Sequence, residues 1–136
     1  CARGPRLFMS LLQLRKKRST SPTTLSEELT MKRGELWTVR GSSYASKPRP
    51  VLIVQNDDLD LFDSIVLCLM TSQDSSDIST RVAIDPTEKN GLRKKSWVLT
   101  EKIYSARKGE LGARIGTLSK EDMVKVSRQL SIVLDL

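Results

Sequence analysis

The chain has 136 residues, the usual size of one domain, and its 38% hydrophobic and 29% charged residues suit a globular protein with one core. Histidine is absent, which excludes a Ser-His-Asp triad, a Cys-His pair and the common histidine-bearing zinc sites. No apolar run approaches the roughly 20 residues that span a bilayer, so we expect no membrane partner. The net charge of +7 favours a polyanion, and RNA, DNA and an acidic protein all fit.

Residues 1–30 differ in composition from the rest of the chain. They contain six basic and two acidic residues, with a basic run next to a Ser/Thr/Pro stretch, which is typical of disorder. More than half of the excess charge therefore lies here, which weakens the argument from total charge for nucleic-acid binding. Because the chain begins with Cys1 and not with methionine, we expect its first residue not to be a native translation start, and we expect 31–136 to form the domain.

Six segments within 31–136 have the composition of strands. They span approximately 36–39, 50–55, 64–70, 81–85, 96–105 and 113–118. The third is a continuous apolar run typical of a buried strand, and the fourth alternates as a half-buried strand does. Asn90-Gly91 is a turn signal between the fourth and fifth. The connections are too short for repeated crossovers, so the sequence predicts an antiparallel meander or barrel.

One helix is expected after the last strand. Ser119 is its predicted N-cap, and Asp122 follows three residues later in a position like that of a capping box. An apolar stripe at helical spacing is expected to pack on the sheet, and it consists of Met123, Val126, Leu130 and Val133. The predicted class is α+β, mainly β.

The cysteines carry little chemistry. Cys68 lies in the third apolar run, which favours a buried thiol over a nucleophile or half of a disulfide. Cys1 is the only other cysteine. This usage fits a reducing cytoplasm.

Arg49 stands between two prolines directly before the second strand. Pro50 favours extended geometry at Arg49, and Pro48 fixes the backbone that leads into it. A guanidinium offers five donors and keeps its charge, so a phosphate is a natural partner. Taken alone, however, the segment is better explained by a surface arginine at a loop end, in an ion pair.

Two further polar segments are candidates for binding. Thr71, Ser72 and Gln73 follow a buried strand directly, a common position for site residues, although a loop whose hydroxyls form turns is the simpler explanation. The basic turn, Arg93–Lys95, has the composition of a phosphate-backbone contact. A solvated hairpin tip is the more common explanation.

The order of these segments is more informative than any one of them. "MKRGELWTV", a Gly/Ser loop, "KPRPVLIVQND", an apolar strand ending in "TSQ", "PTEKNGL", "WVLTEKI" and "IGTLS" before a helix follow one another. This series resembles the MazF/PemK family of toxin ribonucleases. The resemblance covers 31–136 and none of 1–30, and the "RPVLIV" block and the "NGL" turn are its most specific parts. The start of the family coincides with Met31, so the resemblance implies that Met31 is the native initiator and that 1–30 are encoded upstream or derived from expression.

The resemblance implies a compact, SH3-like antiparallel barrel with a C-terminal helix, related to the gyrase poison CcdB. It implies a cytoplasmic homodimer that cleaves single-stranded RNA at specific sequences without a metal or another cofactor, and an antitoxin that covers the site. The family's key arginine falls on Arg49 and its key threonine on Thr71. In that mechanism the RNA 2′-hydroxyl attacks the neighbouring phosphorus, while Arg49 stabilises the charge and Thr71 holds the phosphate.

The remaining RNA contacts are expected from a loop, a strand end and the fifth strand. The candidates are Tyr44, Lys47, Ser72, Gln73 and Lys102. Residues 41–47 lack the carboxylate that some members carry, so the general base is unassigned. Glu101 is followed by Lys102 where many members have glutamine, which leaves the sequence preference open. A CcdB-like gyrase inhibitor without nuclease activity is the alternative, and a weak paralogue that mainly binds an antitoxin is a third.

Overall fold

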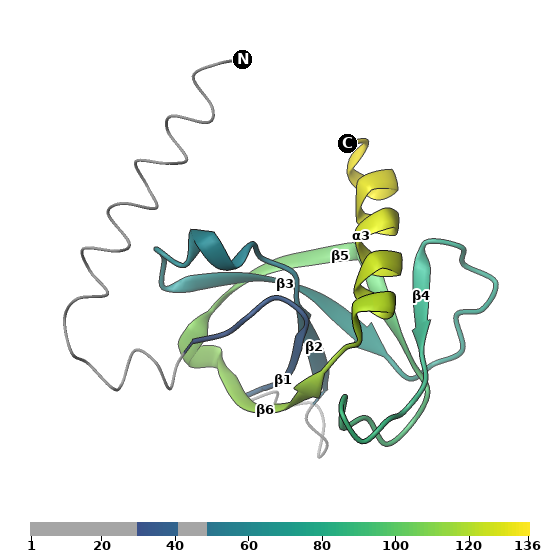
Figure 1. Cartoon of the computed structure of the whole chain (residues 1–136), viewed down its shortest axis with the longest axis horizontal. Coiled ribbons are helices and arrows are strands. Elements are labelled where there is room, and N and C mark those ends of the chain that lie inside the picture. Colours follow the sequence, from purple (N-terminus) through teal and green to yellow (C-terminus); the bar gives the residue numbers. More distant parts are fainter. Residues whose placement is uncertain (1–29, 41–48) are drawn as a thin grey trace.

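The described residues, 30–40 and 49–136, form six strands and a C-terminal helix in a computed structural model (Figure 1). The strands are β1 (Glu35–Val39), β2 (Pro50–Ile53), β3 (Ser64–Thr71), β4 (Arg81–Ile84), β5 (Ser96–Arg107) and β6 (Leu111–Thr117). Short 3-10 helices, η1 (Asp57–Leu59) and η2 (Lys108–Glu110), precede β3 and β6, and the helix is α3 (Lys120–Leu134). Each segment predicted to be a strand or helix in this part of the chain is one.

The strands form one antiparallel sheet in the order β4-β5-β3-β2-β1-β6. β1, β2 and β3 follow one another as a meander, and β5 then pairs with β3 and carries β4 on its other side. Figure 1 shows that the sheet is strongly curled and that α3 lies against one of its sides. This confirms the mainly β, antiparallel architecture with one C-terminal helix.

The two faces of the sheet are buried in two separate apolar clusters. The cluster under α3 includes Leu52 and Cys68 from the sheet together with Val126 of the helix. The cluster on the opposite face includes Val51 and Leu67. Because successive residues of a strand point to opposite faces, β2 and β3 are fixed on both sides. The polar residues at their ends therefore stand on a rigid frame.

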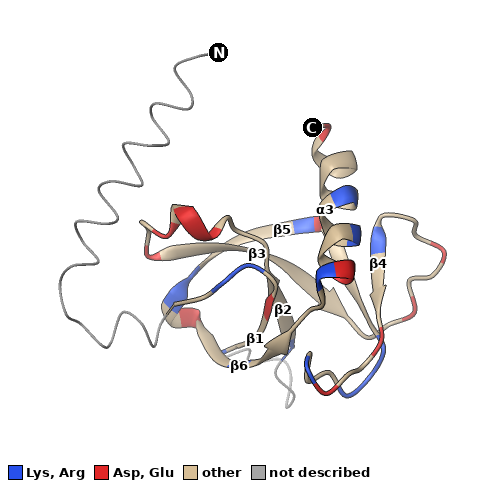
Figure 2. Cartoon of the chain, viewed as in Figure 1, with Lys and Arg blue, Asp and Glu red and all other residues tan. Residues whose placement is uncertain are grey.

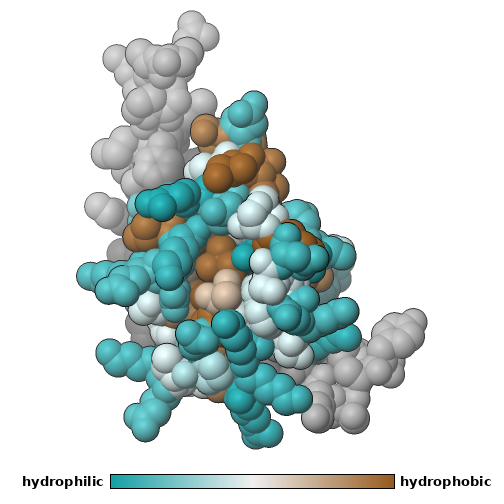
Figure 3. Space-filling view, turned by 90° about the vertical axis from the view of Figure 1, so that its right-hand side faces the viewer, coloured by the Kyte–Doolittle hydropathy of each residue, from teal (hydrophilic) through white to brown (hydrophobic). Residues whose placement is uncertain are grey.

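α3 begins as the sequence predicts. The Ser119 side chain accepts a hydrogen bond from the backbone N–H of Asp122 at 3.1 Å, which satisfies one free donor of the first turn. Val126 and Leu130 are buried against the sheet. Ile132 and Leu134 stay exposed, and Figure 3 shows apolar side chains near the top of the molecule, at the height of the C-terminal end of the helix.

None of the helices in the described part of the chain is long and apolar enough to cross a membrane. The expected disordered extension, residues 1–30, lies outside the described residues except for Thr30. Its character stays a prediction.

Candidate active site

Arg49 and Thr71 stand on neighbouring strands at the same end of the sheet. The β2–β3 register pairs Val51 with Leu69 and Leu52 with Cys68. Continued two residues beyond Val51, this register places Arg49 opposite Thr71. Residues opposite each other in an antiparallel pair point to the same face, so the guanidinium and the hydroxyl lie on one side of the sheet.

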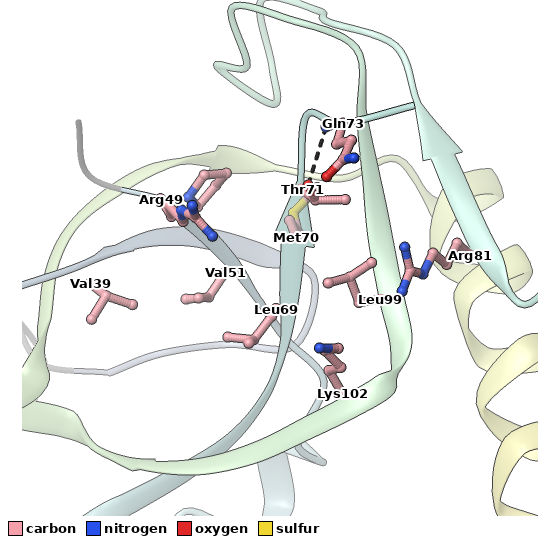
Figure 4. Close-up of a pocket in the computed structure, with 11 residues that line it drawn as sticks. Val39, Arg49, Val51, Leu69, Met70, Thr71, Gln73, Arg81, Leu99 and Lys102 are labelled. Atoms are coloured by element: carbon pink, nitrogen blue, oxygen red, sulfur yellow. Dashed lines mark hydrogen bonds between the residues drawn. The ribbon is translucent and has the colours of Figure 1, made fainter. Parts of the chain in front are cut away.

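Both residues line a hollow of about 620 Å³ on the face opposite α3 (Figure 4). Its floor is apolar and adjoins the second core cluster, to which Val51 belongs and against which Val39 and Leu69 pack. The apolar lining residues are Val39, Pro50, Val51, Leu69, Met70 and Leu99. A site with an apolar floor and polar groups at its rim suits a ligand that has both an apolar ring and a charged group.

The hydroxyl of Thr71 is oriented by the turn that follows it. Thr71 Oγ1 accepts a hydrogen bond from the backbone N–H of Gln73 at 3.1 Å (Figure 4). A hydroxyl has one donor and two acceptor sites, so this bond leaves the O–H of Thr71 to donate elsewhere. Gln73 also lines the hollow, whereas Ser72 is exposed beside it and is not among the lining residues.

A second wall of the hollow comes from β4 and β5 and carries Arg81 and Lys102. Cys68 pairs with Ile103 and Met70 pairs with Val98, so four residues of β5 stand opposite Leu69 alone. Such a bulge changes the direction of the side chains on the longer strand. Lys102 faces the hollow from this bulge, as Figure 4 shows.

Arg81 is held in place by two partners. Its Nε and Nη2 donate to Oε2 of Glu101 at 3.0 and 2.7 Å, and its Nη1 donates to the hydroxyl of Ser75 at 3.0 Å. The bond from Arg81 is the main cause that lowers the pKa of Glu101. The Ser75 hydroxyl in turn donates to the carbonyl of Gln73 at 3.2 Å. Hydrogen bonds thus connect the wall that carries Arg81 with the turn that carries Thr71 and Gln73.

The structure brings four of the predicted site residues to one hollow, and these are Arg49, Thr71, Gln73 and Lys102. Ser72 is adjacent and exposed. Tyr44 and Lys47 lie outside the described residues, so their placement stays a prediction.

Sequence reasoning did not single out Arg81. The alternation of "RVAID" puts Arg81 on the face opposite Val82 and Ile84, which was a readable signal. What the sequence did not reveal is that this face borders Thr71 and Gln73.

Cys68 does not take part in the hollow. It is fully buried under α3, and this burial is the main cause that raises the pKa of its thiol to about 12. A thiol with that pKa is protonated at neutral pH and is a poor nucleophile. The predicted buried thiol is confirmed.

Comparison with known proteins gives the family. Residues 32–134 match the family model described as "PemK-like, MazF-like toxin of type II toxin-antitoxin system". The chain belongs to this family. A curated relative, the "Probable endoribonuclease MazF" of Mycolicibacterium smegmatis, is 34% identical over 107 residues, which cover 78% of this chain and 98% of the relative.

Solved structures of the family share the fold. An "Endoribonuclease in complex with its cognate antitoxin from Mycobacterial species" has a TM-score of 0.67 at 26% identity. The match covers 78% of this chain and 96% of the chain in that structure. MazF from Deinococcus radiodurans in a MazE-MazF crystal has a TM-score of 0.65 at 15% identity, over 79% of this chain and 97% of its own. At that identity the second likeness supports the fold alone.

Proposed function

We propose that this protein is an endoribonuclease toxin that cleaves single-stranded RNA at specific sequences without a metal ion. The observation that carries the proposal is the meeting of Arg49 and Thr71 at the rim of one hollow, in a chain of the MazF-like toxin family. The relative from M. smegmatis, which carries the name of a probable endoribonuclease, supports the same activity.

The proposed reaction uses the RNA as its own nucleophile. The 2′-oxygen attacks the adjacent phosphorus and loses its proton, and the bond from phosphorus to the 5′-oxygen breaks as that oxygen gains a proton. The products are a 2′,3′-cyclic phosphate and a 5′-hydroxyl. Negative charge grows on the non-bridging oxygens in the transition state, where Arg49 stabilises it. The free O–H of Thr71 donates to the same phosphate and holds it for attack in line.

The other polar groups of the hollow are assigned to binding. Lys102 offers a cation on the wall facing Arg49, and Gln73 and the neighbouring Ser72 offer donors and acceptors near Thr71. The apolar floor suits the ring of a base. Arginine stays protonated at any relevant pH, so acceptance of the 2′-hydroxyl proton falls to a group other than Arg49.

A cognate antitoxin and a second copy of the chain are the proposed protein partners. The antitoxin is supported by the family description and by the mycobacterial endoribonuclease of known structure, which is described in complex with its own antitoxin. An antitoxin segment with acidic and apolar residues would complement a hollow that combines cations with an apolar floor. The homodimer is carried over from the family.

The test is cleavage of a broad pool of single-stranded RNA by the full chain in the presence of EDTA. We expect cuts at a short common sequence, and no cuts with Arg49→Ala at equal thermal stability. A strict requirement for a divalent metal, or equal activity of the variant, would contradict the proposed mechanism. If no RNA is cut while DNA gyrase is inhibited, the protein is instead a CcdB-like gyrase inhibitor.

A further inference from the structure

The loop between β4 and β5, residues 85–95, has a fixed conformation although most of its residues are polar. The side chain of Asn90 is its centre and is buried, with only 2% of its surface exposed. Its Oδ1 accepts hydrogen bonds from the backbone N–H groups of Thr87 and Leu92, both at 2.9 Å, and its amide donates to the carbonyl of Asp85 at 2.8 Å. The turn is therefore closed by three bonds to one side chain.

The same loop is packed against β6 without a gap. Gly91 has a φ of +70°, and a Cβ at this position would lie 2.1 Å from the carbonyl oxygen of Ile115. A Cβ at Gly116 would lie 2.3 Å from the backbone of Asn90. Only glycine fits at such close approaches, so the backbone of the loop is held directly against that of β6.

This rigid loop presents the basic turn, whose three consecutive cations are exposed. The Nζ of Lys95 lies 5.7 Å from the ring centroid of Trp97, a cation–π distance, and 3.9 Å from Oδ1 of Asp85. Lys95 is thus positioned by a ring beneath it, while just over half of its side chain stays open to solvent. In Figure 2 the cations lie in the loop below β4.

The basic turn continues the face that carries the hollow. Thr71 and Trp97 are Cα partners in the β3–β5 pairing, so their side chains lie on the same face. Lys95 stands over Trp97 on that face, and neither residue is among those that line the hollow. It also lies near enough to Asp74 to contribute to the lowered pKa of that carboxyl, after the larger effect of hydrogen bonds from Ser76.

We infer that the basic turn binds backbone phosphates of the RNA outside the hollow, with Lys95 as its fixed cation. This inference rests on the proposed function and extends the RNA path from Arg49 and Thr71 over Trp97. The loop holds four basic residues against two carboxylates, so it attracts a polyanion. Trp97 is only 7% exposed, so this contact is to phosphate and does not stack a base. It is independent of RNA sequence.

Random-sequence, single-stranded DNA of 4 and 12 nucleotides is the probe, because it carries the same phosphates but no 2′-hydroxyl and so is not cleaved. The full chain is compared with Lys95→Gln and with a matched control, Lys125→Gln, an exposed lysine of α3 on the other side of the sheet. We expect Lys95→Gln to bind the 12-mer severalfold more weakly and the 4-mer unchanged. The slope of log K against log salt should fall by about 0.7 for each phosphate that the variant no longer neutralises. Lys125→Gln should match the wild type.

A second measurement monitors the fluorescence of Trp97. The 12-mer should change the tryptophan emission of the wild type, the 4-mer should not, and Trp97→Phe should abolish the change. Equal salt slopes for the wild type and Lys95→Gln would overturn the inference even if RNA cleavage is intact. Weaker binding of polyglutamate, but not of the 12-mer, by Lys95→Gln would also overturn it and assign the turn to an acidic protein. Absence of RNA cleavage by the wild type would overturn the proposed function instead.

Discussion

The hollow has two rims that are built in different ways: the first carries Arg49 and Thr71, and the second, the wall from β4 and β5, carries Arg81 and Lys102. Arg49 and Thr71 stand at the ends of two central strands whose pairing is regular, and a proline fixes the backbone beside the arginine. Arg81 and Lys102 come from an edge strand and a bulged strand, and their placement depends on contacts between distant residues. The first rim should therefore act as a phosphate clamp, and the second as a wall that contributes to binding of the RNA.

The largest effect is expected at the first rim. Arg49→Ala removes the cation assigned to the transition state, so kcat for RNA cleavage should fall by about 10³-fold, below detection when cut ends are mapped. Arg128→Ala, an exposed arginine of α3, is the control and should keep full activity. Single-turnover kinetics and a thermal melt measure both variants. If Arg49→Ala raises KM but leaves kcat unchanged, Arg49 binds the substrate and does not stabilise the transition state selectively.

Thr71 should have a smaller but clear effect. Thr71→Val keeps the shape of the side chain and removes its donor, so we expect kcat to fall by about 10²-fold. Thr71→Ser retains the hydroxyl that accepts from the N–H of Gln73 and should keep most of the activity. The ratio of kcat for Thr71→Ser to kcat for Thr71→Val separates the effect of hydrogen bonding from that of packing. Equal values would show that the hydroxyl does not contribute to cleavage.

The second wall should affect which RNA is cut more than how fast. Lys102→Gln leaves Arg49 and Thr71 untouched, and loss of one exposed cation changes binding by less than about 1 kcal/mol, or roughly fivefold. We expect a higher KM and a changed cleavage sequence, measured by sequencing the ends cut from an RNA pool. Lys125→Gln is the matched control. A loss of kcat as large as that of Arg49→Ala would show that both rims act on the transition state.

The smallest effect is expected for the ion pair of the second wall, and it depends on pH. Arg81 holds the pKa of Glu101 below its usual value of 4.5, so the pair stabilises the fold above that value and loses its effect as the pH falls through the lowered pKa. Glu101→Gln should therefore lower the free energy of unfolding by at most about 1 kcal/mol at neutral pH. Urea melts across pH should show the difference vanishing in acid.

The difference between the rims also explains what the sequence could predict. The strands, the capped helix and the burial of Cys68 follow from apolar patterns and from Ser119, which act locally. Arg49 and Thr71 border apolar strands, but neither was decisive alone, and the resemblance of the ordered segments to the family singled them out. Arg81 was missed because its role depends on Glu101 and Ser75, brought together only by the folded sheet. Lys102 was predicted by family resemblance, but the bulge that turns it inward was not.

The basic turn shows the same division. Its charges and the Asn90-Gly91 turn were visible in the sequence, yet a solvated hairpin tip was the more common explanation of them. Its relation to Thr71 became apparent only from the β3–β5 register, which places Trp97 between the two. Short-range patterns identify strands and turns, whereas the register between strands decides which of their ends form one site.

The chemical identity of the ends left on cleaved RNA tests the central claim most directly. Purified protein is incubated with single-stranded RNA in EDTA, and both new ends are analysed by mass spectrometry. Attack by the 2′-hydroxyl predicts a 2′,3′-cyclic phosphate on one fragment and a 5′-hydroxyl on the other, both absent with Arg49→Ala. A 5′-phosphate with a 3′-hydroxyl would mean that water, and not the RNA, is the nucleophile, and would contradict the mechanism assigned to Arg49 and Thr71.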